Sequence, residues 1–565
     1  MQKTSFLLIL FIFISDLSGQ SLGTEWYHIY KSTEDNRSRD IEIDHNGFIY
    51  NTGYFTGDLD IDPGEGEIIF ETESFGEDGY IIKMRPNGDI MWSKQLKAES
   101  FDAVIPYAVE VDDQSHVIVA GFYEGTVDFD PGSGTFNRTA QGFDGFILKL
   151  DVNGDLIWFS QIEGAGDQAI FSMELDNDGS VFVTGYYSNT TDFDPSGSRV
   201  ETSAKSGDDP FVLKLDKDGS FEWVYTFGAD GSFDGGNKIA VGDDGSIGVI
   251  GNYEGTIDFP TPSGMKTVEG RGSDDTFILK LDKDGNYEWS YDVGGESRDY
   301  GQAVDIDKNG NLYFGGYTLS DDFVIDANGE NVQKSFPEFT RNTFLIKYAG
   351  DGTFNKLYVH QAESLTDMKL DGKGHLYVCG AFDDEGYIGS AEIDLTPPHL
   401  EFEDIYFMKL SEDLEPIESG SIVGLGEDLA LDIEISDEDE VYITGWFKSD
   451  IRPNTNDPSE IIQTDDFDGD VYIIKLSSMS SSTVELDAQA EEIKIFPNPV
   501  DDFLDLSIME LSSTARLRIM NIQGMAFMDQ LYKGDGVLSL SLARGTYILQ
   551  VMDGEKMFTG KFIKI

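Results

Sequence analysis

Cysteine and histidine are scarce in this 565-residue chain. The single cysteine, Cys379, allows no internal disulfide bond, so packing alone must stabilise the fold. Because Cys379 lies in the alternating apolar stretch 376–380, we expect a buried thiol on a β-strand rather than a nucleophile. The six histidines lack the spacing of metal ligands, and neither a Gly-x-Ser-x-Gly elbow nor a phosphate-binding glycine loop is present. The sequence therefore predicts no catalytic residue and names no binding residue.

Basic side chains are also few. The chain has 39 Lys and Arg against 106 Asp and Glu, which gives a formal net charge of -67. This charge argues against nucleic acid or an anionic membrane surface as a partner, because both are bound through Lys and Arg. Disorder does not fit either, since 39 Phe, 25 Tyr and 6 Trp are enough to build a large core.

Long hydrophobic runs are missing except at the start of the chain. Lys3 precedes the apolar residues 6–14, and Asp16 interrupts the run well before the roughly 20 residues that a membrane span needs. This layout predicts a signal peptide over residues 1–20. With no cysteine directly after the run, lipid anchoring by that route is excluded. We therefore expect an exported protein without a membrane span.

The C-terminal residues 493–565 differ from the rest in charge, with eight basic and eight acidic side chains. A serine-rich linker, residues 477–492, precedes them. The tail resembles the C-terminal sorting domain of the type IX secretion system of one Gram-negative phylum, through a set of motif residues: Pro497, Asn498, Pro499, Gly524, Gly545, Tyr547 and Lys561. The resemblance implies a small β-sandwich, recognition by the type IX secretion machinery, and a secreted or cell-surface location after passage through the periplasm and outer membrane. The alternative is an ordinary accessory β-domain.

Between the ends, one unit recurs seven times. A strand ending in lysine and an apolar residue repeats at intervals of 66, 65, 66, 67, 62 and 66 residues, with Lys83, Lys149, Lys214, Lys280, Lys347, Lys409 and Lys475. A second apolar strand closes on Gly53, Gly121, Gly185, Gly251, Gly316, Gly380 and Gly445. Asp-x-x-Gly hairpin turns separate the strands, and a tryptophan follows the lysine in the first four units: Trp92, Trp158, Trp223 and Trp289. Each unit therefore predicts four antiparallel strands.

The phase of the repeat distinguishes a closed ring from an open solenoid. Residues 25–30 have the pattern of the fourth strand, whereas residues 471–476 have that of the third. The first strand is then needed to complete the last unit, which only a closed ring requires. The sequence predicts an all-β fold, a seven-bladed β-propeller over residues 24–476 followed by the small β-sandwich. The repeat resembles the bacterial seven-bladed propeller repeat family, which implies the fold and says little about activity.

Long connections between the second and third strands gather on one face of the ring, where we expect any binding site. Three of these loops carry alternating acids that are weak calcium candidates: Asp58, Asp60, Asp62, Asp128, Asp130, Asp192 and Asp194. The calcium hypothesis is weak because Pro63 and Ile69 stand where an EF-hand loop has Gly and Glu. Asp and Pro-Gly also form ordinary turns without a metal. No other cofactor is expected.

Three functions remain open. The first is a non-enzymatic adhesion-type module that binds an extracellular protein or glycan. The second is a polysaccharide-active enzyme that uses paired carboxylates on the long-loop face. The third is a structural surface protein.

Overall fold

The computed structural model describes residues 22–478 except 65, 73–75, 195–196, 232–233, 328–329, 338–339, 384–385, 388–393, 396–401, 456–459 and 465–468, together with the strands at 491–492, 503–505, 516–521, 526–531, 537–539, 545–553 and 556–564. Every element in these residues is a β-strand. Leu22–Ser478 forms one compact unit, and the C-terminal strands belong to a second. Among the described residues no helix could cross a membrane. The predicted signal peptide, residues 1–20, lies outside the described residues.

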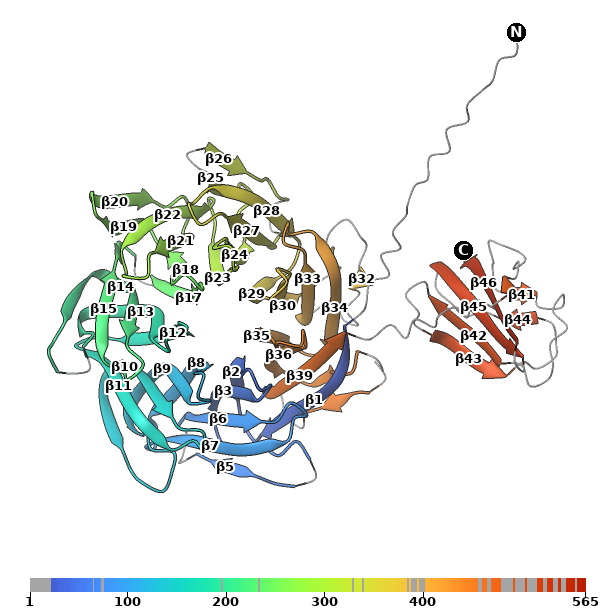
Figure 1. The fold of residues 1–565 in the computed structure, drawn as a ribbon, viewed down its shortest axis with the longest axis horizontal. Coiled ribbons are helices and arrows are strands. Elements are labelled where there is room, and N and C mark those ends of the chain that lie inside the picture. Colours follow the sequence, from blue (N-terminus) through green and yellow to red (C-terminus); the bar gives the residue numbers. More distant parts are fainter. Residues whose placement is uncertain are drawn as a thin grey trace, which may run out of the picture. The chain divides into compact units, whose positions relative to one another are not determined.

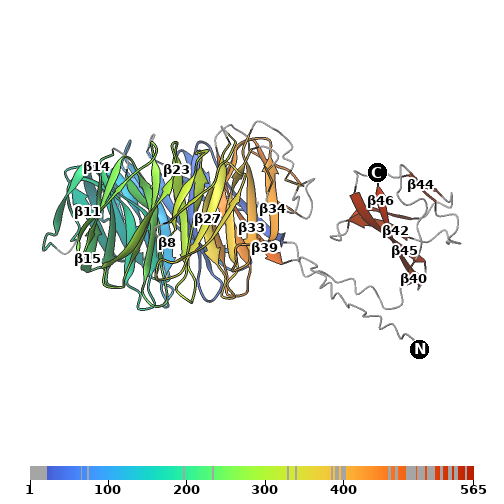
Figure 2. The same ribbon diagram turned by 90° about the horizontal axis from the view of Figure 1, so that it is seen from above.

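The first unit is a closed ring of seven four-stranded antiparallel blades (Figure 1; Figure 2 gives the view turned by 90°). The first three blades are β2 (Asn36–Ile43), β3 (Ile49–Phe55), β6 (Asp78–Met84) and β7 (Ile90–Ala98); β8 (Ala103–Val111), β9 (Val117–Asp128), β10 (Asn137–Leu150) and β11 (Leu156–Gly164); and β12 (Gln168–Leu175), β13 (Val181–Asp192), β14 (Glu201–Leu215) and β15 (Phe221–Thr226).

Blades four to six are β17 (Gly235–Val241), β18 (Ile247–Tyr253), β21 (Asp275–Leu281) and β22 (Tyr287–Gly294); β23 (Asp299–Ile306), β24 (Leu312–Thr318), β27 (Asn342–Tyr348) and β28 (Phe354–His360); and β29 (Ser364–Leu370), β30 (Leu376–Phe382), β33 (Asp404–Leu410) and β34 (Pro416–Gly424). Blade seven is β35 (Asp428–Ile435), β36 (Val441–Phe447), β39 (Asp470–Ser478) and β1 (Leu22–Ser32). The seven blades predicted from the lysine and glycine spacing are confirmed.

The N-terminal strand supplies the outermost strand of the last blade. β1 pairs with β39 from Leu22 opposite Ser478 to Tyr30 opposite Val471. Tyr30 is fully buried and packs in one apolar cluster with Ile473 and with Ile41 of the first blade. The ring is thus closed by hydrogen bonds and by core packing between the two ends of the unit.

The long connections are not free loops. In six blades, the connection between the second and third strands contains a short strand or an extension of the second strand. This segment pairs with the end of the outermost strand of the preceding blade, as Asp60 does with Lys31 and Asp128 with Lys97. The additional short strands are β4 (Asp58–Asp60), β5 (Ile69–Glu71), β16 (Gly228–Ala229), β19 (Thr256–Thr261), β20 (Gly264–Glu269), β25 (Val324–Ala327), β26 (Glu330–Gln333), β31 (Gly386–Tyr387), β32 (Asp394–Leu395), β37 (Asp450–Arg452) and β38 (Ile462–Gln463). These connections join neighbouring blades at the perimeter.

The recurring tryptophans also join blades. Trp158 Nε1 donates a hydrogen bond to the carbonyl of Lys217, 3.3 Å away in the next blade, and its ring packs on Gly219. Gly219 has a φ of 82° in its turn, and a Cβ there would lie 3.0 Å from the indole, so the position requires glycine for two reasons. In the fifth blade Lys356 replaces the tryptophan and pairs instead with Glu415 of the sixth, at 2.6 Å. The degraded motif therefore keeps its inter-blade role there.

Cys379 is buried in β30, as predicted, with no exposed surface. Burial raises the pKa of its thiol well above the usual value, which fits an unreactive structural residue.

The C-terminal unit is all-β as well. One sheet has the order β40 (Glu491–Glu492), β46 (Lys556–Lys564), β45 (Gly545–Asp553), β42 (Arg516–Asn521), β43 (Ala526–Leu531), and β41 (Phe503–Asp505) pairs with β44 (Val537–Ser539). Of the predicted motif residues, Gly545 lies opposite Lys564, Tyr547 opposite Phe562, and Lys561 opposite Ile548. Pro497, Asn498, Pro499 and Gly524 lie outside the described residues.

Candidate functional site

A β-bulge recurs at the same place in every innermost strand. The register shifts at Ser38/Asp40, Pro106/Ala108, Ile170/Ser172, Gly236/Lys238, Gly301/Ala303, Leu365/Asp367 and Ala430/Asp432. A bulge leaves one residue unpaired and re-aims the side chains after it. Two positions that follow the bulge line the centre of the ring, and we call them the first and second rings.

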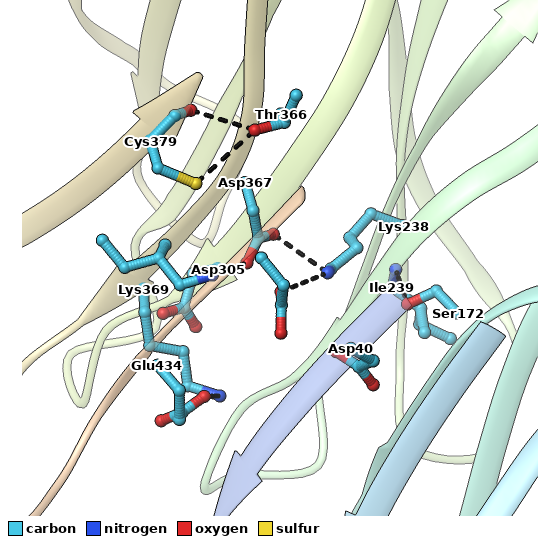
Figure 3. Close-up of polar contacts among 12 residues, drawn as sticks. Asp40, Ser172, Lys238, Ile239, Asp305, Thr366, Asp367, Lys369, Cys379 and Glu434 are labelled. Atoms are coloured by element: carbon cyan, nitrogen blue, oxygen red, sulfur yellow. Dashed lines mark hydrogen bonds and ion pairs between the residues drawn. The ribbon is translucent and has the colours of Figure 1, made fainter. Parts of the chain in front are cut away.

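The two rings gather acids from all round the propeller. The first ring is Asp40, Ala108, Ser172, Lys238, Ala303, Asp367 and Asp432, and the second is Glu42, Glu110, Glu174, Ala240, Asp305, Lys369 and Glu434. A central cavity of about 50 Å³, the acid cavity, is lined by eight of these carboxylates and by only two ammonium groups. Figure 3 shows part of it, with Lys238 and Lys369 coming from different blades.

Several ring side chains hydrogen-bond to the next blade. The innermost strand is a sheet edge, so its N–H groups have no strand partner on the cavity side. Ile41 N–H donates to Asp432 at 2.8 Å, Val109 N–H to Asp40 at 2.6 Å, Ile239 N–H to Ser172 Oγ at 3.3 Å, Leu370 N–H to Asp305 at 2.7 Å and Ile433 N–H to Asp367 at 3.3 Å. In each case the acceptor precedes the donor by one blade. Part of the central acidity is therefore structural.

Lys238 and Lys369 each pair with acids of other blades. Lys238 Nζ lies 3.0 Å from Asp367 and 3.3 Å from Asp432, and Lys369 Nζ lies 2.8 Å from Glu434 (Figure 3). Their side chains keep 28% and 32% exposure, so water reaches the cluster. The remaining carboxylates outnumber the positive charges that could balance them.

This imbalance shows in the pKa values. Burial, followed by the neighbouring Asp432, raises the pKa of Asp40 well above its usual range. Burial opposes the ionisation of Asp432, but Lys238 together with hydrogen bonds to Asp367, Asp40 and the Ile41 N–H holds the pKa of Asp432 below its usual range. Burial raises the pKa of Glu174 to about 7, although Lys369 opposes the rise. The cavity thus holds protons near neutral pH.

An aromatic surface adjoins the acid cavity. We call Tyr54, Tyr107, Phe122, Phe143, Phe171 and Tyr186 the aromatic ladder. All six side chains are partly exposed. Ring centroids lie 5.7 Å apart for Tyr107 and Phe122, 5.2 Å for Phe122 and Phe143, 5.1 Å for Tyr107 and Phe171, and 5.5 Å for Phe171 and Tyr186. Tyr107 and Phe171, the unpaired residues of two bulges, also line the acid cavity. Five of these rings therefore run in contact across blades two and three to the mouth of the cavity, and Tyr54 lies on blade one.

A guanidinium already lies on this ladder. The Cζ atom of Arg39 is 4.4 Å from the ring centroid of Tyr107 and 5.4 Å from that of Tyr54. Several acids lie near the ladder and repel one another. Burial is the main cause, and the charge of Asp35 the second, of the raised pKa of Glu77. Burial and then Asp167 raise the pKa of Asp208 to about 6. The ladder thus combines aromatic faces with acidic neighbours.

The predicted calcium candidates lie apart from this site, in the perimeter connections. Asp60, Asp128 and Asp192 each accept two backbone N–H groups of their own loop, as Asp128 does from Asp130 at 3.1 Å and Phe136 at 2.7 Å. Asp62 and Asp130 accept from Gly64 and Gly132, Asp194 lies in the third such loop, and Asp58 donates its N–H to Thr33. Within the described ranges, no three His, Cys, Asp or Glu residues are grouped to hold a metal.

Matches to known protein families bear on the two units separately. Residues 494–565 match the family described as "Secretion system C-terminal sorting domain". They are a type IX sorting domain. The protein is accordingly secreted or displayed on the cell surface, and the domain implies contact with the secretion machinery. Residues 288–323, which run from β22 through β24, match a family described as "Beta-propeller repeat".

Individual relatives are more distant from this sorting-domain protein. It is 26% identical over 173 residues to an uncharacterized WD repeat-containing protein of Acanthamoeba polyphaga mimivirus, covering 24% of this chain and 12% of the other. It is 29% identical over 193 residues to regulatory protein FlaEY of Caulobacter vibrioides, covering 34% and 17%. The chain thus spans less than a fifth of either relative. The WD40 β-propeller domain of Doa1 is 12% identical with a TM-score of 0.27, over 63% of this chain and 93% of that one.

The two rings and the ladder were missed in the sequence. A usable signal existed: the innermost strands alternate directly before their turns, and in residues 40–43 and 432–435 both alternate positions are acids. Aligning those segments across the seven repeats would have shown the eight acids at equivalent positions of the innermost strands.

Proposed function

We propose that this protein is a secreted, non-enzymatic binding module whose binding surface is the aromatic ladder together with the mouth of the acid cavity. The observation that carries the proposal is the run of partly exposed rings, five of them in tilted or edge-on contact with one another, that ends at a carboxylate-lined cavity. Aromatic residues are enriched in binding interfaces because they offer large, rigid contact area. A partly exposed ladder of this kind favours binding over a purely structural coat.

The ladder lies on the half of the blades that carries the long connections. Tyr107 and Phe171 lie midway along β8 and β12, and Phe122 and Tyr186 come before the long connections that follow β9 and β13. Binding sites of rigid scaffolds gather at such ends. The residues proposed here, however, lie on the strands, which hold them more rigidly than loops would.

Glycoside hydrolysis in the acid cavity fits the geometry poorly. Its volume of about 50 Å³ is far below the ~300–1,000 Å³ typical of ligand pockets, so a sugar ring does not fit between the carboxylates. Asp40, Asp305, Asp367 and Asp432 also accept backbone N–H groups, which occupies oxygens that catalysis would need. These contacts favour binding at the mouth over chemistry inside.

The test is a binding screen of the purified secreted chain against extracellular polypeptides and neutral and acidic glycans. The Tyr107→Ala/Phe171→Ala double variant should lose at least about tenfold in affinity for any ligand found. Met265→Ala is the matched control, because Met265 is an apolar side chain with 62% exposure on the β20 hairpin. A ligand bound equally by the double variant, or turnover of a bound glycan, would refute the proposal.

A further inference from the structure

We infer that the ligand of the aromatic ladder is a basic segment of a polypeptide, with one arginine or lysine side chain stacked on Tyr107 and its charge directed toward the acid cavity. This inference rests on the proposed function and specifies its ligand class. It also assigns Arg39 a role, as an internal competitor for the same ring.

The first observation is that the chain itself demonstrates the contact. The guanidinium of Arg39 lies over Tyr107 at 4.4 Å and over Tyr54 at 5.4 Å, a geometry of favourable cation–π attraction. The Nε atom of Arg39 is buried without a hydrogen-bond partner among the described residues. Arg39 is therefore held by the rings without full polar satisfaction, and an external guanidinium with better partners can replace it.

The second observation is charge complementarity. Eight carboxylates and two lysines line the cavity at whose mouth Tyr107 and Phe171 lie. Further acids lie beside the ladder: Glu77 and Glu124 interact electrostatically near Arg39, and Asp167 and Asp208 do so near Tyr186. A cation gains from every one of these groups that is ionised, whereas an acidic peptide or anionic glycan is repelled.

The third observation is size. A cavity of about 50 Å³ is far smaller than the ~300–1,000 Å³ of a typical ligand pocket, so the end of a basic side chain is the part that can enter. The flanking residues of the peptide then have the six rings of the ladder to pack on. The shape therefore fits a point cation on an extended, partly apolar chain.

The experiment measures binding of labelled octa-arginine and octa-glutamate peptides to the full secreted chain at 150 mM salt, where attraction to distant surface charges is screened. Octa-arginine should bind and octa-glutamate should not. Tyr107→Leu keeps apolar bulk without an aromatic face, and it should weaken octa-arginine binding by about tenfold. Arg39→Ala should strengthen it by about threefold or more, because the ring becomes free. Opposite signs from two residues in contact cannot come from loss of folding.

Two controls separate the contact from general charge. Arg298→Ala removes an equal charge at an exposed site paired with Asp274 at 3.1 Å, and it should change affinity by less than about twofold. Met265→Ala should have no effect. Equal octa-arginine affinity in wild type and Tyr107→Leu, or weaker binding by Arg39→Ala, would overturn the inference. If binding of another ligand in the screen still depends on Tyr107, the proposed function holds and only the basic-peptide inference is refuted. If binding of no ligand depends on Tyr107, both the inference and the proposed function are refuted.

Discussion

Asp432 of the seventh blade accepts a hydrogen bond from the backbone N–H of Ile41 in the first, over 2.8 Å. The contact crosses the place where the ring closes. It links the first and last blades at the centre of the ring, as the pairing of β1 with β39 closes the ring at the perimeter. Closure of this propeller therefore depends on a side-chain acceptor as well as on the strand order.

Removing that acceptor should destabilise the ring. Asp432→Ala leaves the Ile41 N–H without its partner and takes one of two carboxylates from Lys238, and the expected loss is about 1–3 kcal/mol in the free energy of unfolding. Asp432→Asn keeps an acceptor and should lose less. Denaturant unfolding measures both variants. Equal stability of wild type and Asp432→Ala would show that the N–H is satisfied in another way.

The N-terminal strand should be indispensable, whereas the C-terminal unit should not. Tyr30→Ala opens a cavity in the cluster that joins β1 to the first and last blades, and it should cost about 3–5 kcal/mol. Truncation after Ser478 removes no part of the ring and should leave its melting temperature unchanged. Calorimetry of both proteins provides the comparison. A large fall in melting temperature on truncation would contradict the independence of the two units.

Stability should fall between pH 5 and pH 8. Burial raises the pKa of Asp404 to about 7, and burial together with Asp404 and Asp450 raises the pKa of Asp428 well above its usual range. A carboxyl group whose pKa is higher in the folded than in the unfolded protein contributes fully to stability below its unfolded pKa, near 4. This contribution is lost as the pH rises through the folded pKa of about 7. The melting temperature should therefore be higher at pH 5 than at pH 8.

Asp404→Asn tests the origin of that slope. The amide keeps an acceptor for the N–H of Gly424, 2.8 Å away, and cannot ionise, so this variant should gain on the order of 2 kcal/mol at pH 8. The fifth blade already has Asn342 at this register position. Asp151→Asn is the control, because backbone hydrogen bonds hold the pKa of Asp151 below its usual value. That variant should leave the difference between pH 5 and pH 8 unchanged.

Calcium should not stabilise the perimeter loops. Asp60, Asp128 and Asp192 use their oxygens on backbone N–H groups. We expect the same melting temperature in chelator and in millimolar calcium, since a ligand that binds the folded state would raise it. Asp128→Ala should cost about 1 kcal/mol in either buffer through loss of its turn. A rise of several degrees with calcium, abolished in Asp128→Ala, would restore the metal hypothesis.

Local repetition made the blades predictable. Lys149 and Lys214 mark the third strands, and their spacing counts the blades because each repeat carries the same hydrogen-bonding pattern. The strand type at residues 25–30 even indicated which strand completes the last blade. The loops were less predictable: the acids of residues 58–62 suggested ligands, whereas their backbone pairs with the outer end of the neighbouring blade.

The sequence by itself determined the number of repeats, the closed ring, and the sorting domain with the secreted or cell-surface location that it implies, since these depend on periodicity and on short motifs. The tertiary structure alone decided which side chains gather at the centre of the ring. Asp40, Lys238 and Asp432 are 198 and 194 residues apart in succession, and only closure of the ring brings them to one cavity. Likewise, Tyr107 and Phe171 belong to different blades, and a bulge in each innermost strand turns both toward the same mouth. Distances across a ring are set by blade packing, which no local pattern records.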